Sequence, residues 1–118
     1  MKILFADDDE MYRLLLRAAF SMVEGVEVVG EASDGEQAVA LAAATMPDVI
    51  LLDVEMPHMD GFDAALAIRR ARPDARILLH TGELLEERQA KAQQLDLVLL
   101  DKLRLYDTID TVSEPLAL

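Results

Sequence analysis

Three aspartates stand directly after short apolar runs, at positions where a parallel sheet would bring them together. Asp7 and Asp8 follow the run at residues 3–6, and Asp53 follows the run at residues 49–52. If both runs are strands of one parallel sheet, their carboxylates meet at the edge where open α/β sheets bind ligands. Acidic groups gathered at one edge repel one another unless a cation joins them. This spacing predicts a cation site.

The residue types also fit phosphoryl transfer. Carboxylates, water and phosphate oxygens are ligands that Mg²⁺ prefers, and no cluster of His or Cys in the sequence competes for a softer metal. An aspartate can act as a nucleophile and form an acyl phosphate. The transfer also needs a positive side chain and a positioned hydroxyl. Lys102, just after the run at 97–100, is the candidate ammonium, and Thr81, after the run at 76–80, is the candidate hydroxyl.

Short apolar runs alternate with longer stretches of helical period along the chain. This pattern predicts an α/β fold in which helices cover both faces of a five-stranded, doubly wound parallel sheet. The predicted strands are residues 2–6, 26–30, 49–52, 76–80 and 97–100. The predicted helices begin near residues 10, 34, 61, 84 and 105 and end near 25, 47, 72, 94 and 115. We expect a single domain over residues 1–118.

Three helices carry predictions about packing. The first places six apolar residues on one stripe, which predicts its buried face: Met11, Leu14, Leu15, Ala18, Ala19 and Met22. The helix from residue 84 is mostly polar and is expected to be the least anchored. The last helix has apolar residues four, three and four positions apart, and Pro115 is expected to break it: Leu105, Ile109, Val112 and Leu116.

Composition narrows the class of partner. The chain has 11 basic and 23 acidic residues and a formal net charge of −12, whereas binding to a phosphate backbone rests on Lys and Arg. We therefore expect no direct nucleic acid binding, although a high net charge also simply keeps small proteins soluble. The absence of Cys excludes a disulfide, a thiolate nucleophile and a Cys-based zinc site. No segment is apolar over the roughly 20 residues that span a bilayer, and the apolar start is too short for a signal peptide. We expect a cytoplasmic protein with no membrane partner.

These motifs resemble the receiver (CheY-like) domain of two-component response regulators. The resemblance covers nearly the whole chain and rests on four parts of it: Asp7-Asp8, residues 29–38 at the junction of the second strand and second helix, residues 53–61 and Thr81-Gly82. It implies a flavodoxin-like fold with sheet order 2-1-3-4-5.

The resemblance further implies that Asp53 takes a phosphoryl group from the phosphohistidine of a histidine kinase or a phosphotransfer protein. Asp8, Asp53 and the backbone carbonyl of Glu55 would bind Mg²⁺ directly, and Asp7 would hold it through water. Thr81 would bond a phosphoryl oxygen. Phosphorylation would reshape the face made by the fourth helix, fifth strand and fifth helix, and so change the binding of a downstream protein target. Such a domain catalyses only its own phosphorylation and dephosphorylation.

The chain departs from the family at the fifth strand. The family places a lysine at the end of this strand, often followed by proline. Counted from Asp96, that position falls on Asp101, one residue before Lys102, and Leu103 stands where the proline would be. Because a slip of one residue turns a side chain to the other face, either a bulge restores the register or the ammonium points elsewhere.

Other readings stay open. Val98 or Leu99 replaces an aromatic residue common in the fifth strand, and this favours a receiver-like interaction domain that works without phosphorylation. The acidic run 7–9 also suggests an Asp-nucleophile phosphatase of the haloacid dehalogenase type, which would leave residues 53–57 unexplained. Thr81 could instead cap a helix, and His80 is expected to be a packed side chain. The sequence leaves homodimer formation through the last helices open.

Overall fold

A computed structural model describes residues 1–114 and contains the predicted parallel sheet, in the order β2-β1-β3-β4-β5. Its strands are β1 (Lys2–Ala6), β2 (Glu27–Ala32), β3 (Val49–Asp53), β4 (Arg76–Thr81) and β5 (Val98–Asp101). Its helices are α1 (Glu10–Ser21), α2 (Gly35–Thr45), α3 (Gly61–Ala71), α4 (Glu86–Gln94) and α5 (Leu105–Ser113). The predicted fold class and sheet order are confirmed. The predictions for Pro115 and Leu116 lie outside the described residues.

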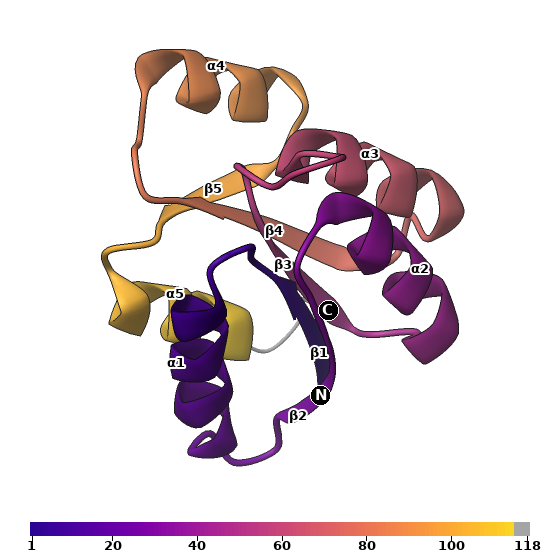
Figure 1. Ribbon diagram of the computed structural model, residues 1–118, viewed down its shortest axis with the longest axis vertical. Coiled ribbons are helices and arrows are strands. Elements are labelled where there is room, and N and C mark those ends of the chain that lie inside the picture. Colours follow the sequence, from indigo (N-terminus) through magenta and orange to yellow (C-terminus); the bar gives the residue numbers. More distant parts are fainter. Residues whose placement is uncertain (115–118) are drawn as a thin grey trace.

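Helices cover both faces of the sheet, with α1 and α5 on one face and α2, α3 and α4 on the other (Figure 1). Strand β3 lies at the centre, and all five of its residues are buried. Its side chains alternate between the two layers, so that Ile50 and Leu52 pack toward α2 and α3, while Val49 and Leu51 pack toward α1 and α5. Burial on both faces explains why this strand is an unbroken apolar run.

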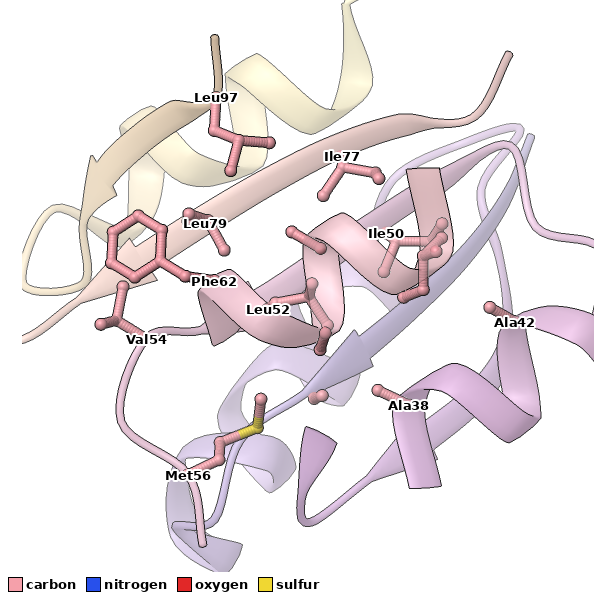
Figure 2. Packing of buried hydrophobic residues seen from close by; sticks show 14 of the residues in the cluster. Ala38, Ala42, Ile50, Leu52, Val54, Met56, Phe62, Ile77, Leu79 and Leu97 are labelled. Atoms are coloured by element: carbon pink, nitrogen blue, oxygen red, sulfur yellow. The ribbon is translucent and has the colours of Figure 1, made fainter. Parts of the chain in front are cut away.

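The larger of the two apolar clusters fills the layer under α2 and α3. Figure 2 shows Phe62 of α3 directed toward Leu79 and Val54 near the carboxyl end of the sheet. Ala38 and Ala42 are the buried residues that α2 contributes to this cluster, and their small size allows the helix to approach the sheet closely. This packing holds the carboxyl ends of β3 and β4 in place.

The predicted buried face of α1 is wrong. Met11 and Met22 are 71% and 86% exposed. The buried residues of α1 are Leu16 and Phe20, and the half-buried Tyr12 packs against the same cluster. These three residues lie four positions apart, and Phe20 stacks on Phe5 of β1 with ring centroids 6.2 Å apart. A stripe with two large aromatic residues offers more apolar area than the stripe of Met, Leu and Ala, and it therefore faces the core.

Helix α4 is weakly packed, as predicted. Within the described part of the chain, Ala92 is the one buried residue of this helix. The helix begins two residues later than predicted, and its N-cap is Leu85, which provides no side-chain hydrogen bond. The alternative in which Thr81 caps this helix is therefore wrong. None of the helices within residues 1–114 is long and apolar enough to cross a bilayer.

Candidate functional site

The predicted acidic residues meet at the carboxyl edge of the sheet. Ala6 and Leu52 pair in the parallel ladder of β1 and β3, so the next residues, Asp7 and Asp53, lie side by side on the same face. Asp7 is fully buried and Asp53 is 5% exposed, whereas Asp8 is exposed at the rim. Two carboxylates far apart in sequence therefore share one small interior space.

Lys102 reaches this space directly. Its Nζ lies 2.6 Å from Oδ2 of Asp7 and 3.7 Å from Oδ2 of Asp53. The ladder of β4 and β5, all of it within the described residues, contains no bulge and ends with the pair Thr81 and Asp101. The carboxylate of Asp101 instead accepts a hydrogen bond from the backbone N–H of Leu103. Both alternatives left by the sequence are wrong: the ammonium enters the site from the residue just after a regular strand.

Tyr12 of α1 holds Lys102 in this position. The Tyr12 hydroxyl donates a hydrogen bond of 2.9 Å to the backbone carbonyl of Lys102. The ring centroid of Tyr12 lies 4.3 Å from the ammonium, within the range of a cation–π interaction. Burial and the nearby acids Asp7 and Asp53 raise the pKa of the Tyr12 hydroxyl to about 12, so it remains a hydrogen-bond donor. The sequence analysis did not identify this residue.

The two buried carboxylates differ in charge balance. Burial alone would raise the pKa of Asp7, but close contacts with His80, Lys102 and the backbone N–H of Asp9 outweigh it and lower that pKa. Burial, together with the charge of Asp7, raises the pKa of Asp53 to about 7. Burial also opposes the charge on Lys102, yet contacts with Asp7 and Asp53 raise its pKa overall. Lys102 therefore compensates Asp7 more fully than it compensates Asp53.

His80 lies beneath this cluster. It pairs with Asp53 in the ladder of β3 and β4, and its Nε2 is 3.3 Å from Oδ2 of Asp7. The residue is fully buried, as predicted for a packed side chain, and burial lowers its pKa. Neither ring nitrogen has a hydrogen-bond partner among residues 1–114. Its contact with Asp7 was not expected, because sequence spacing does not show which face of a strand meets the site.

Thr81 is engaged with residues that follow β4. Its buried hydroxyl donates to the backbone carbonyl of Glu83 at 3.0 Å and accepts a 2.8 Å hydrogen bond from Nη1 of Arg88. Nη1 of Arg88 also donates to the Glu83 carbonyl at 3.1 Å, and Nη2 pairs with the carboxylate of Glu55. Arg88 therefore joins Thr81 to Glu55. The sequence pattern gives no sign of this contact, because Arg88 lies on a mostly polar helix that was expected to be the least anchored.

Most of the predicted site residues line one pocket of about 340 Å³. Its walls contain Asp8, Asp9, Asp53, Glu55, Thr81, Gly82, Glu83 and Lys102, with Asp7 buried beside them. A second pocket of about 620 Å³ adjoins it, shares Asp8 and Glu55, and reaches Arg88 of α4. The site is open enough for a small ionic group to reach Asp53.

The donor set fits a hard divalent cation. Three acidic residues, Asp7, Asp8 and Asp53, lie at this edge, and the ammonium of Lys102 contacts Asp7 and Asp53. The carboxylate of Glu55 is already paired with Arg88. Burial and, after it, the charge of Asp7 raise the pKa of Asp53, and a bound cation would oppose both effects. Carboxylates around an accessible pocket are the environment in which Mg²⁺ keeps part of its water shell.

A family model and a related protein of known name both match this chain and point to the same family. Residues 3–102 match the model of the response regulator receiver domain. The response regulator protein VraR of Staphylococcus aureus is 39% identical over 82 residues, which are 70% of this chain and 39% of that protein. The chain thus spans about two fifths of the length of this relative.

Solved structures agree. The signal receiver domain of the response regulator NarL from Mycobacterium tuberculosis is 36% identical and superposes with a TM-score of 0.80, covering 86% of this chain and 82% of that one. The response regulator domain of Thermotoga maritima CheB is 25% identical, with a TM-score of 0.81 and 98% of each chain covered.

Proposed function

Because this chain belongs to the receiver domain family of the response regulators of two-component systems, we propose that Asp53 is its phosphoacceptor. Asp53 takes a phosphoryl group from the phosphohistidine of a histidine kinase or phosphotransfer protein. One Oδ of Asp53 attacks phosphorus, the bond from phosphorus to the histidine nitrogen breaks, and the electron pair of that bond stays on the nitrogen. The domain catalyses its own phosphorylation and dephosphorylation and acts on no other substrate.

The main support for this proposal is the unequal pairing of two buried carboxylates. The ammonium of Lys102 forms a close ion pair with Asp7 and lies farther from Asp53. Burial, together with the charge of Asp7, raises the pKa of Asp53 to about 7, and Nζ of Lys102 lies 2.6 Å from Asp7 but 3.7 Å from Asp53. A carboxylate that is poorly compensated and faces an open pocket is available as a nucleophile or metal ligand. A structural ion pair would instead be balanced.

The proposal assigns Mg²⁺ as the cofactor. Asp8, Asp53 and the backbone carbonyl of Glu55 would hold the ion directly, and Asp7 would hold it through water. When bound, the ion neutralises charge on the phosphoryl group and on Asp53. The Lys102 ammonium lies 3.7 Å from Asp53 and would contact an oxygen of a phosphoryl group attached there.

Thr81 lines the same pocket as Lys102 and Asp53 and would also bind the phosphoryl group. Its hydroxyl can donate one hydrogen bond, which now goes to the Glu83 carbonyl. In the phosphorylated domain it would donate this hydrogen bond to a phosphoryl oxygen instead. This exchange gives the domain two states that differ near α4. We propose that a downstream protein target distinguishes them, and that nucleic acid is not a direct ligand of this strongly acidic domain.

Mass spectrometry with a small phosphodonor tests the proposal. Incubation with acetyl phosphate and Mg²⁺ should add the mass of one phosphoryl group to the chain, and EDTA should prevent the addition. Asp53→Asn should abolish the product, while the matched variant Asp110→Asn, which changes an exposed aspartate on α5, should behave like the original chain.

Two results of these experiments would contradict the proposed function. If the chain gains no phosphoryl group and calorimetry detects no binding of Mg²⁺, the proposal is rejected and an interaction domain independent of phosphorylation becomes the better account. Retained labelling in Asp53→Asn would reject Asp53 as the acceptor. The phosphatase alternative gains no support from the family match, and it would require multiple turnover on a phosphate monoester.

A further inference from the structure

Arg88 is the side chain through which α4 contacts the site. Its guanidinium has three acceptors: the Thr81 hydroxyl at 2.8 Å, the Glu83 carbonyl at 3.1 Å and the Glu55 carboxylate. The side chain is 19% exposed, so most of it is shielded from water. A guanidinium bonded to three acceptors in a fork geometry is strongly held in one place.

The rest of α4 provides few other links to the site. Within residues 1–114, Ala92 is the buried residue of this helix, and its N-cap Leu85 forms no side-chain hydrogen bond. Lys91 lies over the ring of Phe62, 4.7 Å from its centroid, but this contact leads to α3. The partly buried Leu99 of β5 cannot form a polar contact with Thr81. Arg88 therefore connects the Thr81 hydroxyl to α4 in this chain.

The Thr81 hydroxyl cannot donate a hydrogen bond to the Glu83 carbonyl and to a phosphoryl group on Asp53 at the same time. Within the described residues it makes no hydrogen bond to Asp53, and its single proton is donated to the Glu83 carbonyl. To reach a group on Asp53, Oγ1 must move away from its present partners. Arg88 cannot follow freely, because the Glu55 and Glu83 oxygens also hold it.

We propose that Arg88 is a positioning residue that holds Thr81 and α4 in the unphosphorylated arrangement, and that its bond to Thr81 breaks when the hydroxyl turns to the phosphoryl group on Asp53. This inference rests on the proposed function. An interaction present in one state only shifts the equilibrium between states by its own free energy. Removing Arg88 should therefore favour the phosphorylated arrangement and uncouple α4 from it.

Calorimetric titration of the full chain with beryllofluoride and Mg²⁺, a mimic of the phosphoryl group, tests this. Arg88→Ala should bind beryllofluoride about tenfold more tightly than the original chain, since a hydrogen bond to a charged donor is lost from the unliganded state alone. The control Arg70→Ala, at an exposed position of α3, should leave the affinity unchanged. In a Thr81→Ala background, Arg88→Ala should have no further effect, because Arg88 acts through the Thr81 hydroxyl.

Hydrogen exchange gives a second readout, which an ion pair of purely structural role would not move. In the original chain, beryllofluoride should speed amide exchange at the start of α4. In Arg88→Ala the exchange there should already be fast and should respond little to the ligand. Arg88→Lys keeps the charge but lacks the fork that bonds Thr81 and Glu55 together, so it should behave like Arg88→Ala.

The outcomes separate the two proposals. If the original chain binds no beryllofluoride with Mg²⁺, the proposed function fails and the inference about Arg88 fails with it. If the original chain binds and Arg88→Ala binds equally well, Arg88 is only a surface ion pair. If Arg88→Ala binds more weakly, Arg88 contacts the phosphoryl group itself as a second cation. The last two results overturn the inference and leave the proposed function standing.

Discussion

Replacing Asp53 by Asn should stabilise the metal-free protein at neutral pH. Burial and the charge of Asp7 raise the pKa of Asp53 from 3.8 to about 7. Between these two values the folded protein holds a proton on Asp53 that the unfolded chain has already released. The folded state then binds more protons than the unfolded state, so the contribution of Asp53 to stability falls as the pH rises through this window.

The size of the effect follows from the two pKa values. Each pH unit between them contributes about 1.36 kcal/mol, so the total approaches about 4 kcal/mol above the folded pKa. Asn has the shape of the aspartate and no charge. The free energy of unfolding of Asp53→Asn minus that of the original chain should therefore grow by about 2.6 kcal/mol between about pH 5 and about pH 8.

His80 and Asp7 also change the stability with pH, but their pKa values are lowered and not raised. Their contributions must be separated from that of Asp53. The lowered pKa of His80 makes its contribution to stability rise with pH up to its ordinary value of 6.5, because the unfolded chain binds the proton that the buried ring rejects. The lowered pKa of Asp7 stabilises the fold above 3.8, and this contribution is lost only in more acidic solution. The difference between Asp53→Asn and the original chain removes most of both contributions.

Urea unfolding followed by circular dichroism in EDTA measures these free energies across the pH range. Asp110→Asn, which changes an exposed aspartate of α5 away from the site, is the matched control. Added Mg²⁺ should narrow the gap between Asp53→Asn and the original chain, because an ion that binds only the folded original chain stabilises it. If this gap stays flat or shrinks between about pH 5 and about pH 8 in EDTA, the pKa of Asp53 is not raised in the folded protein.

Three further substitutions test the supports of the site. Tyr12→Phe removes the hydrogen bond to the Lys102 carbonyl and should cost about 1 kcal/mol in urea unfolding and slow labelling by acetyl phosphate; unchanged labelling would show that Lys102 needs no such support. Gly61→Ala places a Cβ that overlaps the carbonyl oxygen of Asp53, so it should cost about 2 kcal/mol and weaken Mg²⁺ binding in calorimetry; unchanged unfolding and Mg²⁺ binding would contradict it. Asp34→Ala removes the side-chain cap of α2 and should cost about 1 kcal/mol in thermal unfolding while labelling at Asp53 continues at the same rate; slower labelling would mean that α2 helps to shape the site.

The convergence of Asp7 and Asp53 could be predicted because it depends on strand ends alone. The carboxyl ends of parallel strands meet at one edge whatever the details of packing, and the apolar run before Asp53 marked a central strand. The sequence predicts Lys102 as the ammonium, but the register in which it follows the fifth strand could not be predicted in the same way. Counting residues gives no account of the turn before β5, where Asp96 adopts a left-handed conformation with a φ of 56°, nor of the hydrogen bond from Tyr12 that holds the lysine backbone.

The buried face of α1 and the contacts of Arg88 escaped prediction for related reasons. Hydrophobic periodicity counts apolar residues equally, whereas packing favours the stripe with the larger rings, here Tyr12 and Phe20. Arg88 stands seven residues after Thr81 on a helix whose other residues are mostly polar. A long side chain can return to the site from such a helix, and only the observed geometry shows that it does.

The unequal charge balance of two adjacent carboxylates supports the proposal that one site holds both an ion and a nucleophile. Lys102 lies 2.6 Å from Asp7 and 3.7 Å from Asp53, and the pKa of Asp7 falls while that of Asp53 rises to about 7. The two groups titrate as a coupled pair, in which neutralising one neighbour lowers the cost of ionising the other. A divalent cation at the rim would therefore favour the ionised form of Asp53, the form that can attack phosphorus. Because Asp7 stays charged and paired with Lys102, the ammonium remains beside Asp53, where under the proposed function it would meet the incoming phosphoryl oxygens. Under the proposed function, these different pKa values would leave Asp7 as a fixed anion and Asp53 as the reactive carboxylate.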